Sequence, residues 1–79
     1  MNLYKVSQTE NNTYDTYDAM IVAATTEAVA RNTHPFSSDW SHAVSTWCSA
    51  PDKATVELIG TTTNPYYDGE IVLSSYNAG

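Results

Sequence analysis

The chain has 79 residues, and its 9 acidic and 3 basic side chains give a formal net charge of −6. A chain of this length forms one domain, residues 1–79, and its acidic surface excludes the cationic contacts that drive binding to nucleic-acid phosphates or anionic lipid. Charged residues make up only 15% of the sequence, whereas an ordinary soluble domain has about 25%. With 11 Thr, 8 Ser and 6 Asn in their place, the predicted surface consists mainly of hydroxyl and amide groups.

Cysteine usage and hydropathy indicate the compartment. Cys48 is the single cysteine, so no disulfide forms within the chain, and a lone thiol fits a reducing environment. The amino terminus has no basic region followed by an apolar stretch, and no apolar run approaches the roughly 20 residues of a membrane span. The sequence therefore predicts a soluble cytoplasmic protein with no membrane contact.

The first half of the chain predicts two strands and a short helix. Leu3–Ser7 alternates weakly and is followed by a polar loop. Thr16–Ala24 becomes a continuous apolar run, which is typical of a central strand or of a strand covered on both faces. A helix is expected to begin at Thr25 or at the next threonine, because a hydroxyl there accepts from an orphan backbone N–H. Asn32 is expected to end this helix after about two turns, since Pro35 cannot continue it.

The middle of the chain leaves two alternatives. Four apolar residues follow a helical spacing of i, i+3, i+4 and i+7, namely Trp40, Ala43, Val44 and Trp47. The segment Ser38–Thr46 forms either a second short helix or an ordered loop fixed by the tryptophans. In both cases we expect the two tryptophans to close the core.

The second half predicts two more strands. Ala54–Gly60 alternates and is rich in β-branched residues, and Glu70–Ser75 supplies the last strand. The connection contains Asn64-Pro65 and Asp68-Gly69, which are turn sequences. The expected fold is a small α+β domain, a mostly antiparallel sheet of about four strands with a helix on one face.

The candidate catalytic groups are few. Cys48 with His34 or His42 matches the residue types of a thiol nucleophile and its base, but a small buried hydrophobe beside Trp47 is the favoured interpretation of the cysteine. A zinc site would need both histidines, the cysteine and Asp52 together, without a recognised spacing. We expect no metal and no cofactor.

The carboxylates do not form an evident pair either. Asp15 and Asp18 are three residues apart, so a strand places them on opposite faces. The glycines form no phosphate-binding loop. The sequence therefore favours a non-enzymatic protein.

Tyrosine and aspartate recur together in predicted loops. The sequence Tyr14-Asp15-Thr16-Tyr17-Asp18 precedes one strand, and Tyr66-Tyr67-Asp68 precedes the last. Tyrosine is enriched at interfaces, and a neighbouring carboxylate adds affinity for a basic partner. About half of the six tyrosines are expected to serve the fold instead. The predicted partner-binding residues are Glu10, Tyr14, Asp15, Tyr17, Asp18, Tyr66, Tyr67 and Asp68.

Nine short strings are distributed along the chain: Met1-Asn2-Leu3-Tyr4, Tyr14-Asp15-Thr16-Tyr17-Asp18, Ile21-Val22-Ala23-Ala24, Ala30-Arg31, His34-Pro35, Trp47-Cys48-Ser49, Pro51-Asp52-Lys53, Ile59-Gly60 and Tyr76-Asn77-Ala78-Gly79. Together they resemble a family of small uncharacterised proteins encoded by phages and prophages. The resemblance implies a setting in an infected or lysogenic bacterium and an inhibitor of host defence, anti-CRISPR proteins being one kind. It carries no catalytic residues with it.

The leading hypothesis is therefore a non-enzymatic inhibitor that binds a host protein with a basic surface, a CRISPR effector complex being one candidate. Nine carboxylates in 79 residues are too sparse for a mimic of duplex phosphates. The alternatives are a small thiol-dependent enzyme that uses Cys48 with a histidine, and a structural or accessory virion protein. The sequence does not fix the oligomeric state.

Overall fold

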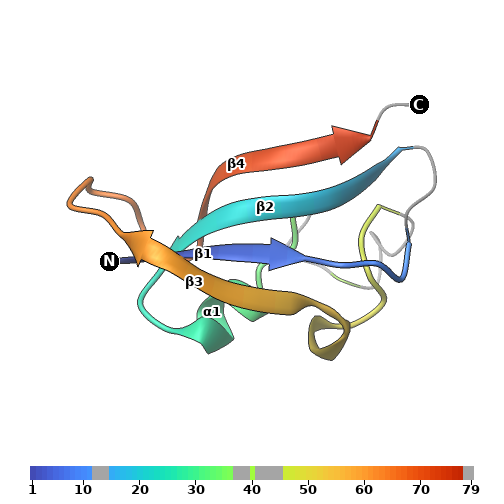
Figure 1. Cartoon of the computed structure of the whole chain (residues 1–79), viewed down its shortest axis with the longest axis horizontal. Coiled ribbons are helices and arrows are strands. Elements are labelled where there is room, and N and C mark those ends of the chain that lie inside the picture. The colour runs from blue at the N-terminus through green and yellow to red at the C-terminus, as the bar shows by residue number, and fades with distance from the viewer. Residues whose placement is uncertain (12–14, 37–39, 41–45, 78–79) are drawn as a thin grey trace.

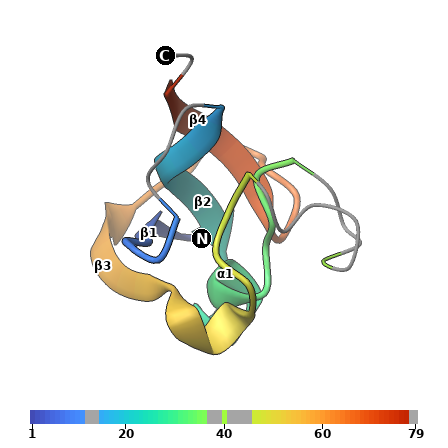
Figure 2. The ribbon, with the colours of Figure 1, turned by 90° about the vertical axis from the view of Figure 1, so that its right-hand side faces the viewer.

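The computed structural model of the protein describes residues 1–11, 15–36, 40 and 46–77, and it shows the predicted α+β fold (Figure 1). Four antiparallel strands form one sheet in the order β3-β1-β2-β4. Their bounds are β1 Asn2–Ser7, β2 Thr16–Ala24, β3 Thr55–Thr61 and β4 Glu70–Asn77. The described helical elements are the helix α1 (Glu27–Arg31) and the 3-10 turn η2 (Pro51–Lys53). Figure 2 shows α1 on one face of the twisted sheet.

The register of the strands places alternate apolar side chains on that face. Val6 lies opposite Met20 of β2 and Val56 of β3, and Tyr4 lies opposite Val22. Because successive side chains of a strand point to opposite faces, these residues form one layer beneath α1. The apolar run of β2 ends in Val22, Ala23 and Ala24, which are all buried, so this part of the strand is covered on both faces.

The core is small and centres on one tryptophan. Its buried residues are Tyr4, Val6, Met20, Val22, Ala24, Ala30, Trp47, Cys48 and Ala54. Trp47 is the largest fully buried side chain, and Trp40 packs against the same cluster. The sequence-based expectations that the tryptophans close the core and that Cys48 is buried beside Trp47 are confirmed.

α1 begins and ends where the sequence signals predict. Thr26 has extended backbone angles, and its Oγ1 accepts a hydrogen bond from the Val29 N–H at 3.3 Å. Glu27 in the first turn faces the positive end of the helix dipole. Asn32 caps the carboxyl end, where its backbone N–H donates to the Ala28 carbonyl at 3.1 Å and the Thr33 N–H donates to the Ala30 carbonyl at 3.2 Å.

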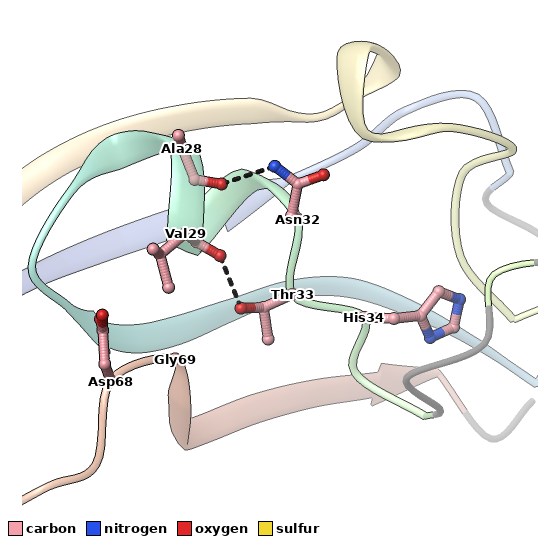
Figure 3. Close-up of a pocket in the computed structure, with 7 residues that line it drawn as sticks. All are labelled: Ala28, Val29, Asn32, Thr33, His34, Asp68 and Gly69. Carbon is pink, nitrogen blue, oxygen red and sulfur yellow. Dashed lines mark hydrogen bonds between the residues drawn. The ribbon is translucent and has the colours of Figure 1, made fainter.

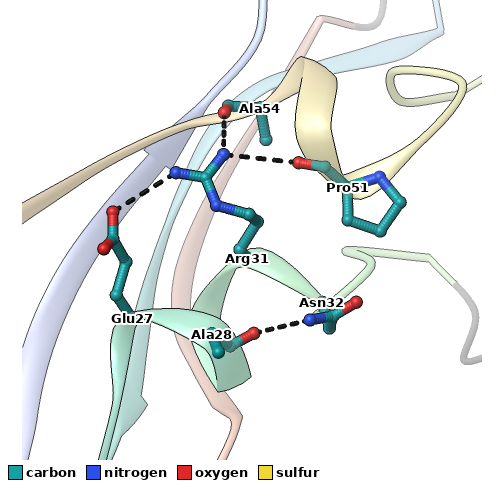
Figure 4. A network of polar contacts seen from close by, with 6 residues as sticks. All are labelled: Glu27, Ala28, Arg31, Asn32, Pro51 and Ala54. Atoms are coloured by element: carbon teal, nitrogen blue, oxygen red, sulfur yellow. Dashed lines mark hydrogen bonds and ion pairs between the residues drawn. The ribbon is translucent and has the colours of Figure 1, made fainter.

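Arg31 joins α1 to the start of β3 (Figure 4). Its Nη1 donates to the Ala54 carbonyl at 2.5 Å and to the Pro51 carbonyl at 3.5 Å. Its Nη2 forms an ion pair with Glu27 at 3.2 Å. One of the three basic side chains of the protein therefore serves the fold, which leaves Lys5 and Lys53 as the other cations.

Some details differ from the expectations. The predicted helix over Ser38–Thr46 lies outside the described residues, apart from Trp40 and Thr46. β3 begins one residue later than predicted, and β4 continues to Asn77. Leu58 lies on the same side of β3 as Val56, but 59% of it is exposed, because β3 is an edge strand and the five-residue α1 covers only part of the sheet. No helix in the described parts of the chain is long and apolar enough to cross a membrane.

Candidate functional site

Two tyrosines far apart in the sequence meet at one end of the sheet. β2 begins where β4 ends, and Tyr17 lies opposite Tyr76 in the register of the two strands. Their ring centroids are 4.8 Å apart, with the ring planes tilted by 57°, a favourable geometry for an aromatic pair. We call Asp15, Tyr17, Asp18 and Tyr76 the tyrosine patch.

Asp15 restricts the position of this tyrosine pair through two hydrogen bonds to the end of β4. Its Oδ1 accepts a hydrogen bond from the Tyr76 hydroxyl at 3.1 Å, and its backbone N–H donates to the Asn77 carbonyl at 2.6 Å. Its φ of 63° is in the left-handed region, which aspartate adopts more readily than most residues but which still costs energy. The backbone turn and the hydrogen bond together fix where the Tyr76 ring lies.

The Tyr76 hydroxyl remains a neutral donor over a wide pH range. Partial removal from water raises the pKa of this phenol, and the hydrogen bond to Asp15 and the negative charge of that carboxylate raise it further. Tyr76 is nevertheless 48% exposed. One face of a fixed aromatic ring is thus available to a partner.

Gln8 forms hydrogen bonds to the backbone of Tyr17 and Asp18, two residues of the tyrosine patch. This side chain is only 5% exposed, and its Nε2 donates to the carbonyls of Tyr17 and Asn11 at 3.0 and 2.5 Å. Its Oε1 accepts from the Asn11 N–H at 2.8 Å, while the Gln8 N–H donates to the Asp18 carbonyl at 3.2 Å. A buried amide with satisfied hydrogen bonds fixes its surroundings.

The remaining acids of this end have different surroundings. The Glu10 carboxylate accepts from the Ser49 N–H at 2.6 Å, and this hydrogen bond lowers the pKa of Glu10. Glu10 therefore ties the loop after β1 to the segment before η2. Asp18 is exposed and is the extra residue of a β-bulge, because Tyr17 pairs with Tyr76 and Ala19 pairs with the adjacent Ser75.

The second Tyr-Asp sequence lies at the opposite end of β2. Asp68 accepts hydrogen bonds from the backbone N–H and the Oγ1 of Thr25, at 2.8 and 2.9 Å. From the length of β2, Thr25 lies about 30 Å from the start of the strand. Tyr66 is half-buried and Tyr67 is 70% exposed. The structure therefore does not bring the two sequences together, and Tyr14 lies outside the described residues.

Sequence reasoning did not assign Tyr76 or Gln8 to the site. Tyr76 follows the predicted end of the last strand, so only the observed length of β4 brings it beside Tyr17. Gln8 carried one usable signal, since it is the only glutamine and directly follows a strand. Its contacts to Tyr17 and Asp18 depend on the pairing of β1 with β2.

A pocket of about 560 Å³ lies between α1 and the turn before β4 (Figure 3). It is lined by Ala28, Val29, Asn32, Thr33, His34, Asp68 and Gly69. Asn32 Nδ2 donates to the Ala28 carbonyl at 2.8 Å, and Thr33 Oγ1 donates to the Val29 carbonyl at 2.9 Å. Since these polar groups are bound to the backbone of the protein, they do not converge on a ligand as in a small-molecule site.

Cys48 does not have the surroundings of an activated thiol. Burial raises the pKa of its Sγ, which donates to the Ala50 carbonyl at 3.4 Å. His34 Nδ1 accepts from the Phe36 N–H at 3.0 Å, and the His34 ring meets Trp40 edge-on at 4.9 Å. A nucleophilic cysteine needs a lowered pKa instead. Within the described residues, no three His, Cys, Asp or Glu side chains are placed to hold a metal ion.

Comparison with known proteins finds no match to the chain among family models, curated proteins or solved structures. The site is therefore interpreted from its own chemistry. The tyrosine patch combines two aromatic rings, hydroxyl groups and two carboxylates on paired strands. Tyrosine rings beside carboxylates are enriched at protein-binding surfaces in general.

Proposed function

We propose that this protein is a non-enzymatic inhibitor of phage origin, which acts in the bacterial cytoplasm by binding a basic surface of a host defence complex through the tyrosine patch. The observation that carries the binding site is the fixed arrangement of Tyr17 and Tyr76, with Asp15 bonded to the Tyr76 hydroxyl. The phage origin and the defence target follow from the sequence resemblance.

Preorganisation supports this assignment. A tyrosine that is already fixed loses little conformational entropy when it binds, so more of its contact energy appears as affinity. The Tyr17–Tyr76 contact, the Asp15 turn and the buried Gln8 amide all restrict the patch before any partner arrives. An exposed tyrosine without such contacts would have to be ordered during binding.

Charge supports the choice of a basic partner. The net charge of −6 attracts a basic surface over roughly a Debye length, about 8 Å at physiological salt. Asp15 and Asp18 place two of these charges next to the aromatic pair. Charge therefore sets the association rate and its salt dependence, while the rings set the dissociation rate.

The experiment is a plaquing assay in a bacterium whose CRISPR system targets a test phage. Expression of the wild-type protein is expected to raise plaquing efficiency by at least tenfold. Tyr76→Ala is expected to abolish this rise, because it removes one ring of the pair and the hydroxyl that Asp15 binds. No rise with the wild-type protein, in strains carrying different defence systems, would contradict a role in defence inhibition.

Tyr67→Ala is the matched control. Tyr67 is also an exposed tyrosine next to an aspartate, so the substitution removes the same side chain from the other end of the sheet. We expect it to retain inhibition. If Tyr67→Ala abolished inhibition and Tyr76→Ala did not, the binding surface would be the turn before β4 and not the tyrosine patch.

A further inference from the structure

β4 forms one edge of the sheet and is open to pairing with another chain. The described sheet places β2 on one side of it and no strand on the other. The side chains of Val72, Leu73 and Tyr76 are 38%, 67% and 48% exposed. Ile71–Asn77 contains no charged residue and no proline, the two features that natural edge strands commonly use against unwanted pairing.

The backbone direction at the end of β4 shows which groups face outward. The Asn77 carbonyl accepts from the Asp15 N–H and therefore points toward β2. Successive residues of a strand direct their N–H and C=O groups to alternate sides. Ser75 consequently faces β2, while the backbone groups of Ser74 and Tyr76 face the open edge.

The hydrogen bonds near the start of β4 give the same orientation for its backbone groups. The Ala23 carbonyl accepts from the Gly69 N–H at 2.8 Å, so Ala23 faces β4. Two residues earlier in β2, Ile21 faces β4 as well and lies opposite Leu73. Leu73 therefore points its backbone groups toward β2, and those of Ser74 point away.

The other edge strand, β3, is less suited to pairing. It carries Glu57 near its middle, and its register against β1 shifts between Leu3 and Tyr4, which leaves Ile59 as a bulged residue. Charges and bulges both hinder the addition of a strand. β4 has a bulge at Val72 but continues regularly beyond it.

Acidic side chains lie at both ends of β4. Asp15 and Asp18 are at the end where Tyr76 lies, and Asp68 and Glu70 are at the beginning. The hydrogen-bond donors of three of these carboxylates, on Tyr76, Thr25 and the Tyr67 backbone, are neutral. β2 and β4 contain no lysine or arginine. No basic side chain of these two strands therefore neutralises the four carboxylates.

The negative charges at both ends of β4 favour a basic partner segment over a second copy of this chain. A second copy paired antiparallel to β4 would bring Asp68 and Glu70 of one molecule to Asp15 and Asp18 of the other. Asp15 and Asp18 would lie one strand away from the partner's β4, on β2 and just before it, and carboxylates brought this close repel one another. A segment with basic residues at both ends and uncharged residues between them would be attracted at the same positions.

We propose that β4 receives an extended segment of a partner protein as a fifth strand, and that this segment carries lysine or arginine at both ends. Backbone groups of Ser74 and Tyr76 would bind it, as in known cases of strand addition. A groove of about 300 Å³ lined by Leu73, Ile21 and Ala19, with Lys5 also on its wall, offers a place for one apolar side chain of the segment, while the basic residues of the segment would lie at the acidic ends of β4 and away from Lys5. The basic partner rests on the proposed function, whereas the open edge does not.

The experiment is a selection of random ten-residue peptides on the immobilised full-length protein. We expect the enriched peptides to contain lysine or arginine near both ends and β-branched residues between them. In nuclear magnetic resonance spectra, such a peptide is expected to shift the amide signals of Ser74 and Tyr76 and to slow their exchange. No enrichment, enrichment without basic ends, or amide shifts confined to β3 would overturn the proposal.

Ser74→Pro is the test variant. Proline removes the outward N–H and is tolerated on edge strands where that N–H is unpaired. We expect at least a tenfold weaker affinity for the enriched peptide. Ser74→Lys retains the N–H and adds a repelling charge, so it tests the same edge if the proline variant does not fold. Unchanged affinity in a folded variant, or a wild-type dimer in sedimentation that Ser74→Lys dissociates, would overturn the proposal.

The plaquing assay separates this proposal from the proposed function. If Tyr76→Ala abolishes inhibition and a folded Ser74→Pro variant retains it, the tyrosine patch is the binding site and strand addition at β4 is wrong. If basic peptides bind β4 but the wild-type protein inhibits no defence system, strand addition stands and the proposed function is wrong.

Discussion

The two ends of β2 use the same residue types for different purposes. At the beginning of the strand, the Asp15 carboxylate accepts from a tyrosine hydroxyl and fixes an aromatic pair at the surface. At the other end, the Asp68 carboxylate accepts from the N–H and Oγ1 of Thr25 and fixes the turn into α1. Tyr67, next to Asp68, is 70% exposed.

The same pair of residue types thus has different hydrogen-bond partners at the two ends of β2. What distinguishes the two ends is the partner of each carboxylate, which depends on strand pairing. The turn at the second end also requires Gly69, because its φ of 91° is a backbone conformation that other residues rarely adopt. Six variants at three positions, Gln8, Asp68 and Asp15, test the comparison.

Gln8→Ala is expected to have the largest effect, because it removes three hydrogen bonds from part-buried backbone groups of Asn11 and Tyr17. Each such group costs about 1–3 kcal/mol, so we expect the free energy of unfolding in urea to fall by about 2–3 kcal/mol. The turn at Asp68 should be unaffected. A loss below about 0.5 kcal/mol would show that Gln8 does not support the patch.

Asp68→Ala should cost about 1–2 kcal/mol, since hydrogen bonds to a charged group are worth about 1.5–3 kcal/mol and solvent exposure reduces this value. Asp68→Asn keeps one acceptor oxygen and should lose about half as much. Both are measured by urea denaturation. If either variant weakened partner binding without changing stability, the two ends would share the binding function.

Substitutions of Asp15 separate backbone strain from the side-chain contact. Asp15→Gly removes the carboxylate but adopts a φ of 63° without strain. Asp15→Ala removes the carboxylate and keeps the strain. We therefore expect the alanine variant to be about 1 kcal/mol less stable than the glycine variant. Equal thermal stability of the two would show that the left-handed turn is unstrained.

The smallest effect concerns the titration of Tyr76. Its folded-state pKa is raised above the ordinary value of 10.0, so the neutral phenol is favoured by folding. The corresponding stability is present below pH 10 and is lost as the pH rises through the raised pKa. Absorbance of tyrosinate at alkaline pH is expected to show one tyrosine whose pKa falls in Asp15→Asn. An unchanged titration would contradict the Tyr76–Asp15 contact.

Local sequence signals were sufficient for most of the fold. The cap at Thr26, the end at Asn32 and the apolar run Thr16–Ala24 were predicted and confirmed, because hydroxyl capping and hydrophobic patterning act within a few residues. Alternation groups Leu58 with Val56 on one side of β3. Leu58 is exposed because the extent of cover by α1 is a property of packing and not of the strand itself.

The candidate site required contacts between distant residues. Asp15 and Tyr76 are 61 positions apart, and the Asp68–Thr25 contact spans 43 positions. Nothing in either local sequence distinguishes the two aspartates. The sequence predicted which residue types gather near the strand ends, and the strand order decided which of them meet.

The sequence alone therefore determined the fold class, the acidic balance and the positions of the strands and helix, since each depends on composition or on neighbours along the chain. Only the tertiary structure decided that Tyr17 and Tyr76 form a fixed pair, that Asp68 serves the fold, and that β4 is an open edge between acidic ends. The physical reason is that an antiparallel sheet brings together residues from opposite ends of the chain, and the register of β2 with β4 selects the pairs.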